Sequence, residues 1–95
     1  MKQADKFILR LYVTGMTPRS TRAIHIVRAV CEEHLSGQYD LEIVDVYQQP
    51  SRIQEDQIFA IPTLVKYQPI PLRRIIGDMS SKERLMHGLG IHLAS

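Results

Sequence analysis

The chain has 95 residues and a mass of 10.9 kDa, which suits one domain and is too little for two ordinary hydrophobic cores. Hydrophobic residues make up 44% and charged residues 23% of it, so the composition excludes a disordered chain. No apolar run approaches the roughly 20 residues that span a bilayer. The 12 basic and 10 acidic residues leave a net charge of +2, without the long basic block of a nucleic-acid-binding tail. We therefore expect a single domain over residues 1–95 that binds neither membrane nor nucleic acid.

Two further features bear on the compartment. Residues 1–6 are polar and lack the apolar stretch of a secretory signal. Cys31 is the single cysteine, so the chain cannot form an internal disulfide. We expect a cytoplasmic location.

The first half of the chain has the pattern of a strand, a long helix and a second strand. Residues 7–14 are rich in β-forming side chains and predict a buried strand. Thr17 can cap a helix whose first position is Pro18, where the missing N–H costs nothing. Apolar side chains recur on one face over residues 19–35, and β-branched residues are dense over residues 41–47. This order predicts a βαβ unit with parallel strands.

The second half predicts shorter elements. Residues 50–58 can form a short helix, and residues 61–67 a strand that starts at a proline. After a proline-containing turn, residues 72–77 are a candidate return strand, which makes a hairpin. Ser80 and Glu83 have the spacing of a capping box and predict a final helix.

The last segment fits two structures equally well. Gly88 and Gly90 each disfavour a helix interior by roughly 1 kcal/mol relative to alanine. Residues 89–93 also alternate apolar and nonapolar side chains, which is typical of a half-buried strand. Helix and strand both remain open for this segment. Alanine at position 88 is expected to favour the helix.

No catalytic or metal-binding constellation is recognisable. The β-α-β then β-β-α order, with Pro62 opening the third strand, is similar to the thioredoxin-type fold, in which a cis proline commonly stands at that place. The loop between the first strand and helix, residues 14–18, has no thiol, and Cys31 falls on the apolar face of the helix. Cys31 and His34 supply too few ligands for a zinc site. We expect no metal, no cofactor and no catalytic residues.

Charged residues give one further set of candidates. The adjacent carboxylates Glu55 and Asp56 diverge on a helix, and we interpret them as a solvated turn rather than an acid–base pair. Scattered cations are usually solubility features, but some of these can form one positive surface, and Ile26 can be an exposed apolar residue beside it. The candidate partner-binding residues are Arg22, Ile26, Lys66, Arg73 and Arg74.

A collinear set of motifs resembles one known family. The motifs are Leu11-Tyr12-Val13-x-Gly15-x-Thr17-Pro18, Ile43-Val44-Asp45-Val46, Glu55-Asp56, Pro62-Thr63-Leu64 and Arg73-Arg74-Ile75-Ile76-Gly77-Asp78. In this order and spacing the chain is similar to the KaiB family of small bacterial circadian-clock proteins, from about residue 7 to residue 89.

The resemblance implies a non-enzymatic protein with two folds. These are a resting homotetramer of βαββααβ order and a monomeric thioredoxin-like form of βαβαββα order that binds the ATPase KaiC. It also implies contact with a KaiA-like protein and competition with a thioredoxin-like domain of a sensor histidine kinase. Gly88 matches a family position tied to the fold switch, and Arg22, Lys66 and Arg74 match basic partner-contact positions. Pro62, Gly88 and Gly90 are therefore the candidate fold-switch residues.

The chain departs from the family pattern at Met16, where the family has asparagine, and at Glu42, where a lysine is common. Glu42 reverses the charge on a surface that the family uses against KaiC. Two other hypotheses therefore stay open. The first is a thioredoxin-like adaptor in stress or two-component signalling that acts without KaiC, and the second is a thioredoxin-class enzyme that uses Cys31 alone.

Overall fold

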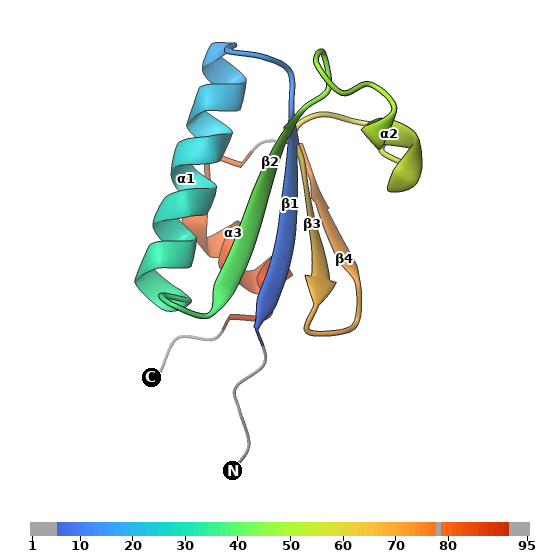
Figure 1. The fold of residues 1–95 in the computed structure, drawn as a ribbon. Helices are drawn as coiled ribbons and strands as arrows, with labels where there is room; N and C mark the ends of the chain where they lie inside the picture. Colours follow the sequence, from blue (N-terminus) through green and yellow to red (C-terminus); the bar gives the residue numbers. More distant parts are fainter. Residues whose placement is uncertain (1–5, 78, 92–95) are drawn as a thin grey trace.

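The elements of the structure follow the order βαβαββα (Figure 1). The computed structural model describes residues 6–77 and 79–91. This order confirms the thioredoxin-like alternative of the predicted fold class. The elements are β1 (Phe7–Val13), α1 (Pro18–His34), β2 (Tyr39–Asp45), α2 (Arg52–Glu55), β3 (Thr63–Gln68), β4 (Arg73–Ile76) and α3 (Lys82–Leu89).

The strands form a sheet in the order β2-β1-β3-β4. β1 pairs in parallel with β2, as the βαβ prediction requires, and in antiparallel with β3. β3 and β4 make the predicted hairpin. α1 and α3 cover one face of this sheet, whereas the short helix α2 lies beside the other face (Figure 1). The sheet therefore has a helical face and an α2 face.

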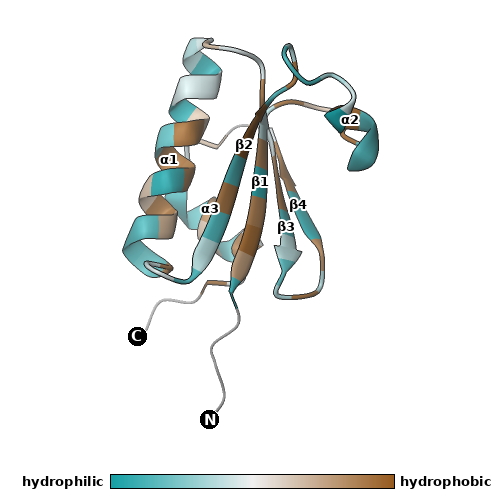
Figure 2. Ribbon diagram, in the orientation of Figure 1, coloured by the Kyte–Doolittle hydropathy of each residue, from teal (hydrophilic) through white to brown (hydrophobic). Residues whose placement is uncertain are grey.

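Alternation along β1 divides the core between the two faces. Leu9, Leu11 and Val13 are buried against α1 and α3, while Tyr12 is buried with a smaller apolar group on the α2 face. Figure 2 shows hydrophobic residues along β1 in the middle of the sheet and hydrophilic residues over α2. The larger core fixes α1 and α3, and the α2 face is left with fewer apolar contacts.

The N-terminus of α1 is closed by a buried hydroxyl. The Thr17 side chain caps the helix by accepting a hydrogen bond from the Ser20 backbone N–H at 3.1 Å, as predicted. Ser20 is buried, and its hydroxyl oxygen accepts two hydrogen bonds. The donors are the Thr14 backbone N–H at 3.0 Å and the Thr17 hydroxyl at 2.9 Å. Ser20 therefore ties the end of β1 to the start of α1.

Replacing Ser20 with alanine is expected to lower the free energy of unfolding by about 1.5 kcal/mol, because the Thr14 N–H loses its acceptor inside the protein. Urea denaturation measures the change. Ser36→Ala, at an exposed position after α1, is the matched control and should change stability little. Equal effects of the two substitutions would contradict a structural role for the Ser20 hydroxyl.

β4 forms one outer edge of the sheet. The Gly77 backbone N–H donates inward to the Pro62 carbonyl at 3.0 Å, so alternation turns the Ile76 carbonyl outward. The guanidinium of Arg84, on α3, donates to that carbonyl at 3.3 Å. The outward-facing carbonyl of Ile76, the last residue of β4, is therefore already hydrogen-bonded within the chain.

The ambiguous C-terminal segment is helical up to Leu89. Gly90 adopts a left-handed conformation with φ of 76° and ends α3, and the Ile91 backbone N–H bonds back to the Met86 carbonyl at 2.8 Å. The predicted strand alternative is not formed over residues 89–91, and its remaining residues lie outside the described ones. Gly90 therefore serves as the helix stop.

Gly88 lies within α3 against β4. A Cβ atom at position 88 would stand 2.7 Å from both Cγ1 and Cδ1 of Ile75, which is closer than side chains pack. The expectation that alanine simply favours the helix therefore needs a correction, since Ile75 is buried and opposes the added methyl group.

Candidate functional site

A polar cluster built around Asp56 lies on the α2 face of the sheet. Asp56 directly follows α2, and its carboxylate accepts hydrogen bonds from the hydroxyls of Tyr12 on β1 and Tyr67 on β3. Nη1 of Arg10 lies 2.9 Å from Oδ2 of Asp56. The Asp56 side chain is only 11% exposed. We call Arg10, Tyr12, Asp56 and Tyr67 the Asp56 cluster, and it fastens the end of α2 to two strands.

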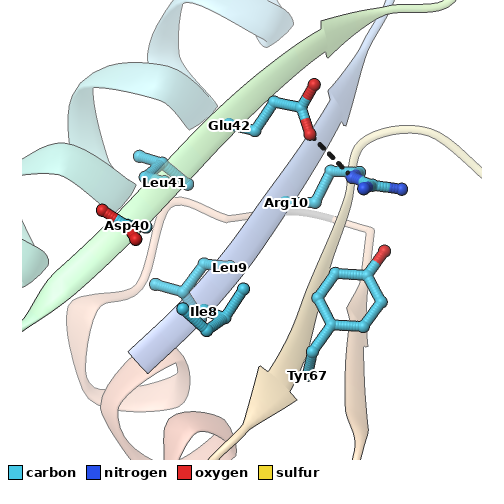
Figure 3. Close-up of a pocket in the computed structure, with 7 residues that line it drawn as sticks. All are labelled: Ile8, Leu9, Arg10, Asp40, Leu41, Glu42 and Tyr67. Atoms are coloured by element: carbon cyan, nitrogen blue, oxygen red, sulfur yellow. Dashed lines mark hydrogen bonds and ion pairs between the residues drawn. The ribbon is translucent and has the colours of Figure 1, made fainter. Parts of the chain in front are cut away.

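A second set of charges continues the cluster toward the edge strand β2. Oε1 of Glu42 accepts from Nε of Arg10 at 3.0 Å and from Nη2 of Arg52 at 2.9 Å. Nε of Arg52 in turn lies 3.1 Å from Oε1 of Glu55. Figure 3 shows the Arg10 and Glu42 side chains meeting across neighbouring strands. The reversed charge at Glu42 is thus paired with two arginines.

A groove of about 410 Å³ opens beside these residues, over β1 and flanked by β2 and β3 (Figure 3). The guanidinium of Arg10 stands 5.2 Å from the centre of the Tyr67 ring, a distance suited to a cation–π contact. The residues that line this groove are Ile8, Leu9, Arg10, Asp40, Leu41, Glu42 and Tyr67.

The interpretation of Glu55 and Asp56 as a solvated pair is wrong for Asp56. Glu55 is exposed, but Asp56 sits at the C-cap of α2, where the chain turns its side chain onto the sheet. The Tyr12 and Tyr67 hydroxyls that hold it come from positions 44 and 11 residues away along the chain. Spacing in the sequence cannot show such a contact.

The cluster shifts the pKa values of its members. Burial disfavours the charge of Asp56, but hydrogen bonds from Tyr12, Tyr67 and Arg10 outweigh burial and lower its pKa. Hydrogen bonding from Arg52 lowers the pKa of Glu42 in the same direction. Burial, followed by the bond to Asp56, raises the pKa of both tyrosines, so they remain hydrogen-bond donors at neutral pH.

These shifts predict acid sensitivity of this fold. A carboxyl group whose pKa is lower in the folded chain adds stability above its unfolded pKa of about 4, and that stability is lost as the pH falls through the folded value. We expect the free energy of unfolding to fall as the pH drops below about 4. Urea denaturation at a series of pH values tests this. In Asp56→Asn the free energy of unfolding should fall less steeply as the pH is lowered. If it falls as steeply as in the wild type, other groups cause the acid sensitivity.

The predicted basic surface is only partly assembled. Lys66 is buried, and its ammonium donates to the Pro69 carbonyl at 2.6 Å, so it is not an exposed contact in this arrangement. Burial, and then the charge of Arg73, lowers the pKa of Lys66. Arg73 and Arg74 are exposed, but adjacent strand residues point to opposite faces, and Arg74 donates to the Asp56 carbonyl at 3.0 Å.

The other two candidates lie on α1. Arg22 is exposed, as the helical pattern predicts. Ile26 is partly buried and packs against the larger core, so it is exposed only in part. Pro62 is buried, and the Ile61–Pro62 peptide is cis, as the fold resemblance predicts.

The structure agrees with the reading of Cys31 as a packing residue. The thiol is buried within α1, and burial with the adjacent Glu32 raises its pKa to about 11.

Over residues 6–77 and 79–91, no three His, Cys, Asp or Glu side chains are grouped so that they could hold a metal ion. In the same residues no helix is long and apolar enough to cross a membrane.

The fold defines the class: a thioredoxin-like protein whose first loop carries no thiol. The structure superposes on the N-terminal domain of SasA from Synechococcus elongatus with a TM-score of 0.73 and 21% identity, covering 95% of this chain and 89% of that one. It also matches chloroplastic thioredoxin z, with a TM-score of 0.74 and 19% identity, over 90% of this chain and 77% of that one. These likenesses establish the fold.

The sequence identifies the family. The KaiB domain profile matches residues 10–91. The circadian clock protein KaiB3 of Synechocystis sp. is 48% identical over 87 residues, which are 92% of this chain and 85% of that protein. The circadian clock oscillator protein KaiB of Prochlorococcus marinus is 47% identical over 91 residues, 96% of this chain and 87% of that protein. The chain belongs to the KaiB family of clock proteins.

Proposed function

We propose that this chain is a non-enzymatic, cytoplasmic clock or signalling regulator that binds a KaiC-type ATPase in its thioredoxin-like arrangement. One observation carries the proposal: a KaiB-family sequence adopts a fold that aligns with the N-terminal domain of SasA over 95% of its length. The implied contacts with a KaiA-like protein or a sensor histidine kinase belong to the same proposal.

Fold switching is the proposed mechanism. The chain would rest as a homotetramer of βαββααβ order, and the partner would bind the βαβαββα order and so increase its population. Pro62, Gly88 and Gly90 are the proposed switch residues. Support comes from their places here, because Pro62 directly precedes β3, Gly88 lies against Ile75 and Gly90 ends α3.

Arg22, Arg73 and Arg74 are the proposed partner contacts that are exposed in this arrangement. Lys66 and Ile26 would contribute indirectly, because Lys66 holds the turn after β3 and Ile26 packs on the core. The buried Lys66 side chain would become a direct contact only if the backbone around it rearranged.

Binding to a purified KaiC-type ATPase tests the proposal. We expect wild-type protein to be retained, and Arg22→Ala or Arg74→Ala to weaken binding about tenfold through the loss of a steering charge. Lys82→Ala, which removes an exposed cation of α3 outside the proposed set, is the matched control. Glu42→Lys tests whether the family charge improves binding. If neither wild type nor Glu42→Lys binds, the KaiC-dependent function is wrong and the adaptor hypothesis takes its place.

The proposed tetramer has its own test. Molecular mass measured over a range of protein concentrations should rise toward four copies, and the population of the homotetramer should fall when the partner is added. A mass that stays monomeric at every concentration would contradict the fold-switching mechanism, because no resting oligomer would then exist.

A further inference from the structure

A groove with a basic rim runs along the outer side of α1, away from the Asp56 cluster. It measures about 370 Å³ and lies where the loop before the helix meets its first three turns. Met16, at the entrance, is 88% exposed, and Ile24 forms an apolar part of the floor. We call it the α1 groove, lined by Met16, Thr21, Ile24, His25 and Arg28.

The arginines at this groove are not paired with a carboxylate within the described residues. Arg28 lines the groove and Arg22 lies one helical turn before His25; both are exposed, and in residues 6–77 and 79–91 their guanidinium groups make no hydrogen bond or ion pair. The carboxylates of α1 lie in its last turn, and Glu32 follows Arg28 by one turn of the helix. Glu32 accepts from the Tyr39 hydroxyl, and Glu33 pairs with Lys82 at 3.2 Å.

The arginines of the α2 face behave differently. Arg10 and Arg52 bond to the Glu42 carboxylate and Arg74 to the Asp56 carbonyl, so these guanidinium groups have partners within the fold. Arg22 and Arg28 of α1 have no such partner among the described residues. Their positive potential is available to a molecule outside the chain.

We propose that the α1 groove is a docking surface for an acidic segment of a partner protein that inserts an apolar side chain between Met16 and Ile24. Charge complementarity selects the acidic segment, and the apolar floor selects a protein over a polyphosphate, which would use the cations alone. The proposal goes beyond the KaiC-dependent function, because it requires neither that ATPase nor a change of fold.

Nuclear magnetic resonance titration of the ¹⁵N-labelled protein tests the proposal. The probe is a short peptide of Glu and Asp with two central Leu residues, and a second peptide has Ser in place of both Leu. We expect saturable shifts of amides in residues 16–28, affinity that falls as salt rises, and binding about tenfold weaker for the Ser peptide. Shifts centred elsewhere, or equal affinity for the two peptides, would overturn the proposal.

Variants separate this groove from general attraction between charges. Arg28→Glu and Met16→Ser should each weaken the Leu peptide about tenfold. Arg73→Glu makes the same change of charge at an exposed cation of β4 and should leave affinity within about twofold. A larger loss in Arg73→Glu than in Arg28→Glu would overturn the assignment. So would tighter binding to duplex DNA or to phosphatidylglycerol vesicles than to the peptide. None of these results depends on whether a KaiC-type ATPase binds.

Discussion

Asp56→Ala is expected to lower the free energy of unfolding of the thioredoxin-like arrangement by about 3 kcal/mol. The substitution removes the acceptor of two tyrosine hydroxyls and the carboxylate paired with Arg10 at 2.9 Å, in a place where water replaces them poorly. Tyr12 is fully buried, so its hydroxyl keeps only the Arg52 carbonyl, at 3.1 Å, as an acceptor. Urea denaturation measures the loss.

Glu55→Ala is the matched control for this experiment. It removes a carboxylate one residue earlier, but that carboxylate is exposed and its ion pairs lie at the surface. The expected loss is at most about 1 kcal/mol. Hydrogen exchange should also rise in residues 49–58 of Asp56→Ala more than in α1. If the two substitutions cost the same, the Asp56 cluster does not hold α2.

A second prediction concerns the contact between Gly88 and Ile75. Helix propensity favours alanine at position 88 by about 1 kcal/mol, but the new methyl group would meet the Ile75 side chain at 2.7 Å. We expect Gly88→Ala to lose about 1 kcal/mol of stability in the wild-type background, where overpacking outweighs helix propensity, and to gain about 1 kcal/mol in an Ile75→Ala background. The coupling between the two positions should be about 2 kcal/mol.

A double-mutant cycle of unfolding free energies gives this coupling. Gly37→Ala supplies a useful comparison, because no atom lies within 4 Å of a Cβ placed there and its effect should be independent of Ile75. Additive effects of Gly88→Ala and Ile75→Ala would show that Ile75 moves aside freely. Gly88 would then act through helix propensity alone.

Much of this fold could be predicted because its signals are local. Thr17 and Pro18 mark the start of α1, and β-branched runs mark the strands. The C-terminal segment was ambiguous because two glycines and an alternating pattern oppose each other. Tertiary contacts decide it in this arrangement: Leu85 and Leu89 are buried in the larger core, and Gly90 takes the left-handed conformation that stops the helix.

The candidate site was less predictable because its contacts join distant residues. Nothing in the spacing of Arg10, Asp56 and Tyr67 indicates that they meet, since they lie on different elements that only the sheet order brings together. The burial of Lys66 was not predictable for a related reason. A lysine near a strand end usually reaches solvent, but here the following turn offers a carbonyl and covers the ammonium.

The hydrogen bond from the Arg84 guanidinium to the Ile76 carbonyl also affects whether copies of this protein can associate through β4. An outer strand with vacant backbone groups is a template on which another polypeptide can polymerise. β4 is only four residues long, and its last outward acceptor already has a donor from α3. Growth of fibrils by addition to this side of the sheet is therefore disfavoured.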